Sequence, residues 1–234
     1  MVKHKTVGKT TRKKIQNKST KKRKFRAVYR DYMDGKIRLD WHQKIGIFCL
    51  VVVISGFAGW VWEFLLQEIS EGFREIYIKG GNLLPWINIY AYGAVLTIVL
   101  TYKLRKKPAL VFVVAAIATG LLEWFAGWAV YTFGDGTRYW NYTGKWWAIG
   151  NIDGFVCPAS AIAFGLGALV LIYVLLPFCI KLALEMKKKV FLTLSITLLV
   201  VVLVDDITNL TLKNLGLPTA MNLYEDLGFK LLHK

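Results

Sequence analysis

Five apolar stretches, each about twenty residues long, constrain this chain more than any other feature of its sequence. They cover about 45–69, 83–102, 109–133, 155–180 and 190–207, and charged residues gather in the links between them. A helix needs about twenty apolar residues to cross the ~30 Å hydrocarbon core of a bilayer. Because the backbone must satisfy its own hydrogen bonds there, the sequence predicts an all-α, polytopic transmembrane helix bundle of about five spans.

The fifth stretch is the shortest of the set. It holds uninterrupted apolar or hydroxyl residues only over 190–204, before Asp205 and Asp206. Fifteen helical residues extend about 22 Å, which falls short of the hydrocarbon core. We therefore expect this helix either to continue past the two aspartates or to end among its neighbours.

Basic residues alternate from one link to the next. The first 44 residues hold 16 Lys or Arg against three Asp, and further basic clusters occupy 103–107 and 181–189. Links on the cytoplasmic side of membrane proteins are enriched in Lys and Arg. The pattern predicts a cytoplasmic N-terminus, an outside C-terminus and a multi-pass location in the cell (plasma) membrane.

The chain divides into three parts on this interpretation. Residues 1–44 form a basic cytoplasmic tail, 45–207 the transmembrane helical domain, and 208–234 a short outside-facing C-terminal segment. The tail is too charged and polar to fold fully alone, so we expect part of it to be disordered. Anionic lipids of the inner leaflet attract such a segment by about 1 kcal/mol per basic residue. That leaflet is its expected partner, and RNA is the alternative.

Two glutamates lie inside otherwise apolar stretches. Gly59 precedes Glu63 by four residues, and Gly120 and Gly127 flank Glu123 by three and four residues. Residues at these spacings share one face of a helix, and small residues let a neighbouring helix approach closely. We therefore expect both carboxylates to face the bundle interior, at similar depth in the outer half of the membrane.

Tryptophan is concentrated in the same outer half. Eight of the nine tryptophans fall there or outside, whereas an interfacial aromatic belt would occupy both sides. The excess favours an aromatic-lined outer pocket, with a belt as the alternative. The candidate ligand-binding residues are Glu63, Glu123, Asn88, Tyr92, Trp60, Trp124, Trp128, Trp140, Tyr142, Asn151, Asp153 and Asp205.

A carboxylate in hydrocarbon costs at least a few kcal/mol, so it is usually paired, protonated or functional. In one interpretation each glutamate is hydrogen-bonded to a neighbouring group and fixes helix register. In the other, both line a polar pocket open to the outside. Desolvation favours the neutral acid, so we expect at least one to be protonated unless a cationic ligand, Arg138 or Lys145 lies near. Asp205 either ends its helix at the interface or joins the glutamates.

The segments around the two glutamates resemble each other. Residues 59–63 and 120–124 share glycine, glutamate and tryptophan, and the two glutamates are separated by sixty residues. Each of these stretches is followed by another that returns in the same direction. The likeness suggests a parallel tandem repeat of two helical hairpins.

Several kinds of chemistry have no motif in this chain. The sequence contains no phosphate-binding Gly-x-x-x-x-Gly-Lys-Ser/Thr loop, no Gly-x-Ser-x-Gly turn and no His-Glu-x-x-His helix. Cys49, Cys157 and Cys179 lack metal-ligand spacing. We therefore assign no catalytic residue and expect no cofactor and no metal site.

The ordered set of motifs over about 45–207 resembles the ABC-transporter type IV permeases, a family of bacterial multispanning proteins. The resemblance rests on Gly59-x-x-x-Glu63, the 85–93 stretch, Gly120-x-x-Glu123-x-x-x-Gly127-Trp128, Trp140-Asn141-Tyr142, Gly154-x-x-Cys157 and a late aspartate, Asp205 or Asp206. It implies a role in transport together with a separate ATPase subunit.

Three functions remain open on the sequence. The first is a transport permease or substrate-binding subunit with an acidic, aromatic-lined outer pocket for a small cationic or amine-bearing ligand. The second is a membrane enzyme that uses paired carboxylates on a lipid or headgroup. The third is a non-catalytic scaffold, and assembly into a homo-oligomer is compatible with each.

Overall fold

The computed structural model describes residues 24–71, 77–78, 82–134, 136, 138 and 140–231. Most of the predicted basic tail, residues 1–23, and the last three residues of the C-terminal segment lie outside the described residues. The described part is a helical bundle with one pair of two-residue strands, which confirms the predicted all-α class.

Four helical runs in the described residues are long and apolar enough to cross a membrane, judged by length and composition. They are α3 (Trp41–Glu71), α5 (Pro108–Phe133), α8 (Lys188–Asn214) and a composite run of α6 (Pro158–Val170), η2 (Leu171–Leu175) and α7 (Leu176–Glu185). The chain is therefore a multi-pass membrane protein.

The composite run contains a single turn of π-helix, η2. Pro177 follows it and has no backbone N–H to bond the carbonyl of Tyr173 one turn earlier. Widening the turn lets the helix pass the proline without ending. The run therefore continues from Pro158 to Glu185 as one candidate span.

The predicted second span is shorter than the sequence suggested. The expected stretch was 83–102, but helix α4 covers only Asn88–Thr101 and is followed by the 3-10 turn η1 (Tyr102–Leu104). Fourteen residues extend about 21 Å. Residues 82–87 are not helical, since Pro85 disfavours helix at the residue before it and the segment bonds to α8 instead.

Helix α8 is longer than the fifth apolar stretch, which alone is too short to cross the hydrocarbon core. It runs from Lys188 to Asn214 and continues past Asp205 and Asp206 without a break. Continuation past the aspartates was one of the two expected outcomes. The reason lies in the bonds of these aspartates, described below.

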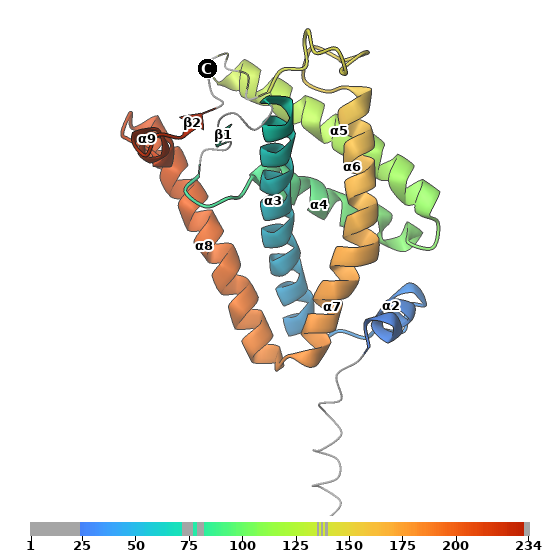
Figure 1. The fold of residues 1–234 in the computed structure, drawn as a ribbon. Helices are drawn as coiled ribbons and strands as arrows, with labels where there is room; N and C mark the ends of the chain where they lie inside the picture. The colour runs from blue at the N-terminus through green and yellow to red at the C-terminus, as the bar shows by residue number, and fades with distance from the viewer. Residues whose placement is uncertain are drawn as a thin grey trace, which may run out of the picture.

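The helices pack around α3, which lies at the centre of Figure 1 with α8 on one side and the α6–α7 run on the other. Helix α5 crosses obliquely and packs on α6 and α4. Helix α2 (Phe25–Met33) and the α7–α8 turn lie at the lower end, and the 134–157 loop lies at the opposite end. Following the predicted orientation, we call these the inner and outer ends.

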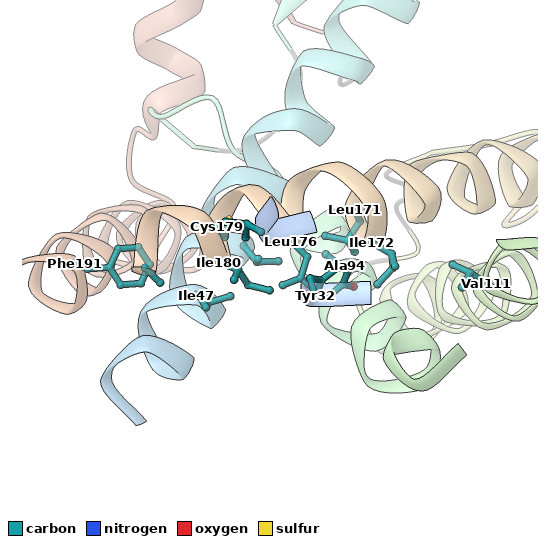
Figure 2. Close-up of a cluster of buried hydrophobic side chains, with 13 residues drawn as sticks. Tyr32, Ile47, Ala94, Val111, Leu171, Ile172, Leu176, Cys179, Ile180 and Phe191 are labelled. Carbon is teal, nitrogen blue, oxygen red and sulfur yellow. The ribbon is translucent and has the colours of Figure 1, made fainter. Parts of the chain in front are cut away.

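The larger apolar cluster sits toward the inner end (Figure 2). It joins α2 to α3, α4, α5, η2, α7 and α8 through fully or nearly buried side chains. Val28 and Tyr32 of α2 lie inside it. Part of the predicted tail is therefore a docked helix that belongs to the core.

The start of α3 is fastened to the α7–α8 turn. The Asp40 carboxylate accepts a bond from the Gln43 amide (3.0 Å), and the Gln43 side chain accepts one from the Asp40 amide (3.1 Å). Gln43 also donates to the Ala183 carbonyl at 2.8 Å. Asp40 forms an ion pair with Lys188, and this contact and the Gln43 bond hold the pKa of the Asp40 carboxyl below its usual value.

Arg105 holds α2 against the α4–α5 link. Its Nε donates to the Tyr32 carbonyl at 3.1 Å, and its guanidinium lies 5.4 Å from the Tyr32 ring and 4.6 Å from the Tyr102 ring. The Tyr173 hydroxyl donates to the Arg105 carbonyl at 2.8 Å. One residue thus connects α2, η1 and the α6–α7 run.

Replacing Arg105 by alanine is expected to loosen α2. The change removes the cation–π contacts and the bond to Tyr32, at a cost of about 1–2 kcal/mol. Amide hydrogen exchange of 25–33 would then quicken by roughly 5- to 30-fold. The matched control is Arg30→Ala, which removes the same charge from an exposed position on α2. Equal exchange in both variants would contradict the role of Arg105.

The outer end is closed by contacts between α8 and the 82–87 segment. The Asp205 carboxylate accepts bonds from the amides of Leu83 (3.2 Å) and Leu84 (2.7 Å), and Asp206 accepts one from the Asn82 side chain at 3.1 Å. Non-helical backbone at membrane depth needs such partners. This explains why two aspartates interrupt an otherwise apolar helix.

The C-terminal residues complete this closure. Helix α9 (Ala220–Asp226) begins where the Ala220 amide donates to Asn209 at 2.8 Å, and the Tyr224 hydroxyl donates to the Leu83 carbonyl at 2.5 Å. Strands β1 (Tyr77–Ile78) and β2 (Lys230–Leu231) then pair in parallel. The C-terminal segment is thereby tied to the residues that lead into α4.

Candidate functional site

Glu63 lies on α3 facing α4. Its carboxylate accepts a hydrogen bond from the Tyr90 hydroxyl at 2.5 Å. Gly59, one turn earlier, lies flat against the Tyr90 ring, and a Cβ at that position would overlap it. Because Gly59 has no side chain, the Tyr90 ring packs directly on α3, and its hydroxyl can bond Glu63.

Glu123 is more deeply buried than Glu63, with 5% of its surface exposed. One carboxylate oxygen lies 2.8 Å from the Tyr142 hydroxyl, and the other lies 2.7 Å from the Ser160 hydroxyl. Helix α5 approaches the segment before α6 closely at Gly127, which packs against Phe155. Glu123 thus joins α5, the following loop and the first turn of α6.

Ser160 has a choice of acceptors. Its hydroxyl lies 2.7 Å from Glu123 and 2.8 Å from the Cys157 carbonyl, and it has one proton to donate. When Ser160 donates to Cys157, its contact with Glu123 requires a proton on the carboxyl group. The geometry therefore accommodates both the charged and the neutral glutamate.

Tyr142 connects the two glutamates electrostatically. Its pKa is raised above the usual value, first because burial disfavours the phenolate and next because Glu123 lies beside it. Glu63 contributes to the same rise. The bond from Tyr142 to Glu123 is the direct contact of this tyrosine with the acids.

Aromatic rings pack around these acids. The Tyr90 ring lies 5.7 Å from the Phe164 ring, which links α4 to α6. The Tyr142 ring meets Trp147 edge-on at 5.5 Å. Two hairpins and one loop thus supply ring faces near the carboxylates.

The loop residues predicted for the site shape the loop itself. Trp140 donates to the Phe155 carbonyl at 2.8 Å, and Trp124 of α5 donates to the Asp153 carboxylate at 3.3 Å. Trp124 also stacks on Trp128, with ring centres 6.2 Å apart. These side chains fix the loop over α5.

Asn151 and Arg138 hold the same loop from within. The Asn151 side chain accepts a bond from the Gly154 amide at 3.1 Å. The guanidinium of Arg138 lies 4.4 Å from the Phe155 ring and donates to the Asp153 carbonyl at 2.5 Å. Arg138, one of the two loop cations that could have paired with a glutamate, thus contacts Phe155 and Asp153, and Lys145 is exposed.

The remaining predicted residues have the following surroundings. Tyr92 points outward from α4 with 58% of its surface exposed, and Trp60 stacks on Phe64. Asp205 accepts bonds from the Leu83 and Leu84 amides and from the Asn209 side chain. Asn88 is half-buried in the first turn of α4.

The sequence reasoning missed Tyr90 and Ser160, which donate to the two acids. Tyr90 lies two residues before the predicted Tyr92, so it faces a different side of α4. Gly59 was a signal in the sequence, because a glycine on a helix leaves room for a large side chain of a neighbouring helix. Ser160 follows Pro158 in the first turn of α6, where a small polar residue is usually taken as a cap.

No three His, Cys, Asp or Glu side chains cluster as a metal site anywhere in the part of the chain that the structure describes. Cys49, Cys157 and Cys179 are buried free thiols.

A family model described as putative ABC-transporter type IV matches residues 50–210, which include both glutamates and all four candidate spans in large part. No curated protein matches the chain, and no solved structure does.

Proposed function

Because the chain belongs to the putative ABC-transporter type IV family, we propose that it is a transport permease or substrate-binding membrane subunit for a small cationic or amine-bearing ligand. The carboxylates of Glu63 and Glu123 would attract the cation. The rings of Tyr90, Tyr142 and Trp147 would contact its alkyl groups and positive face. The separate ATPase subunit that the family name implies is part of the same proposal.

The observation that carries the proposal is that two acids on different apolar helices each bond side-chain hydroxyls: Tyr90 bonds Glu63, and Tyr142 and Ser160 bond Glu123. Neutral hydroxyls orient a carboxylate without cancelling its charge. A site with two acids of like charge favours a cation, because each acid otherwise raises the cost of ionising the other.

A matched pair of probes tests the charge requirement. Choline and its uncharged isostere 3,3-dimethyl-1-butanol have the same shape, so a difference in binding reports the positive charge. Methylammonium and putrescine extend the test to smaller and doubly charged amines. We expect saturable binding of at least one ammonium probe to the purified protein in nanodiscs, measured by native mass spectrometry, and none of the alcohol.

Glu63→Gln and Glu123→Gln are expected to weaken that binding by about 10-fold each, since each removes one charge while keeping a hydrogen-bonding side chain. Glu185→Gln is the matched control, because Glu185 pairs with Lys181 at the inner end of α7. If both outer variants bind as well as the control, or no ammonium probe binds, the cation pocket is wrong and the glutamates serve packing alone.

A further inference from the structure

The loop between α5 and α6 is built from consecutive tight turns. The amides of Lys145, Ala148 and Asn151 donate to the carbonyls of Tyr142, Lys145 and Ala148, at 3.3, 3.1 and 3.2 Å. Each bond closes one tight turn, and Gly144 and Gly150 take positive φ values of +75° and +74° within the first and third of these turns.

The ends of this loop are closed by further backbone bonds. The Tyr142 amide donates to the Gly154 carbonyl at 2.9 Å, and the Ile152 amide donates to the Val156 carbonyl at 2.9 Å. Gly154 has a φ of +73°, a conformation that favours glycine. Backbone hydrogen bonds thus connect residues 142–156 of this loop to one another.

Three large apolar side chains of the loop expose more than half of their surfaces. Trp146, Ile149 and Ile152, spaced by three residues, expose 87%, 82% and 57% of their surfaces. We call these three side chains the outer ridge. Ala148 between them is buried, and Trp147, with 43% of its surface exposed, meets the Tyr142 ring.

The outer ridge is unlike an ordinary exposed surface. Burying one large apolar side chain contributes roughly 1.5–3 kcal/mol of favourable free energy. This loop leaves three such side chains mostly exposed within seven residues. The loop joins the outer ends of α5 and α6, both candidate spans. Phe133, the last residue of α5, is also exposed.

We propose that the outer ridge inserts into the outer leaflet of the membrane, at the level of the lipid headgroups. Tryptophan prefers that level, because its ring is apolar and its N–H can still bond water or headgroups. Isoleucine beside it would enter the upper acyl region. Because Tyr142 lies in the same loop and bonds Glu123, lipid contact at the ridge also helps to hold that tyrosine on Glu123.

Spin labels with two collision partners test the insertion. Ile149→Cys and Lys145→Cys would each be labelled with a nitroxide and reconstituted in vesicles of phosphatidylethanolamine and phosphatidylglycerol. Both positions are exposed, so neither change should disturb the fold. The native cysteines are buried, and the unchanged chain taken through the same labelling supplies the background.

Oxygen dissolves in the bilayer, whereas a nickel chelate stays in water. We expect oxygen collisions to exceed nickel collisions several-fold at position 149 and the order to reverse at position 145. Nickel collisions at 149 equal to those at 145 would place the ridge in water and overturn the proposal. Exclusion of both partners, with dipolar broadening between labels, would show that a second copy of the chain covers the ridge and would overturn it equally.

Discussion

Replacing Gly56 by valine is expected to destabilise the protein more than any other single change at its helix contacts. The indole of Trp86 lies directly on Gly56, and a Cβ there would fall inside the ring. The Ile87 amide also donates to the Gly56 carbonyl at 3.1 Å. Overpacking at such a contact costs about 3 kcal/mol, and it would displace the segment that leads into α4.

The matched control is Gly167→Val. Gly167 is also a helical glycine, on α6, and a Cβ there would meet nothing within 4 Å. We expect its effect to stay within about 0.5 kcal/mol. Thermal unfolding in detergent, followed by size-exclusion chromatography of the soluble fraction, would separate the two variants. Equal midpoints for Gly56→Val and Gly167→Val would show that Trp86 does not depend on the glycine.

This contact shows how far sequence patterns reach in this protein. Small residues near Glu63 predicted a close helix approach, and α4 does approach there. What approaches at Gly56 and Gly59, however, is an aromatic ring in each case, Trp86 and Tyr90. The glycine spacing carries information about the available space but not about which side chain fills it.

Span lengths were predicted unevenly for a related physical reason. Long apolar runs such as 109–133 coincide with helices because a bilayer accepts little else. The 83–102 stretch has a similar composition, yet its first residues are non-helical. Apolar composition places a segment in the membrane region. The hydrogen bonds that replace its helical bonds are made by Asp205 and Asp206, which lie 121–124 residues further along the chain.

The candidate site was predicted in outline. The two glutamates and Tyr142 were chosen from charge and from a polar loop motif, and the structure places Tyr142 on Glu123. Tyr90 and Ser160 were not chosen, because tyrosine and serine are common in helices and only tertiary contacts distinguish these two. The predicted repeat stays a prediction. Each hairpin joins a glutamate to a hydroxyl, but α4 is half the length of the α6–α7 run.

Asp205→Ala is expected to open the outer end of the protein. The change leaves the amides of Leu83 and Leu84 without their acceptor and removes the 2.8 Å bond from Asn209. Unsatisfied amides at membrane depth are costly, and hydrogen bonds to a charged group contribute more than neutral ones. We expect a loss of about 3 kcal/mol in the free energy of unfolding.

The Asp205→Ala variant should also open locally at its outer end before the whole protein unfolds. Asn209 holds the start of α9, and Tyr224 of α9 bonds Leu83, so amide exchange should quicken over both 82–87 and 220–229. Thr208→Ala, one turn along an exposed face of α8, is the control for simple truncation. Asp206→Ala removes a single bond from Asn82 and should cost about 1 kcal/mol. If exchange rises at 82–87 while 220–229 stays protected, the two segments are held independently, and Asp205 is not the residue that joins them.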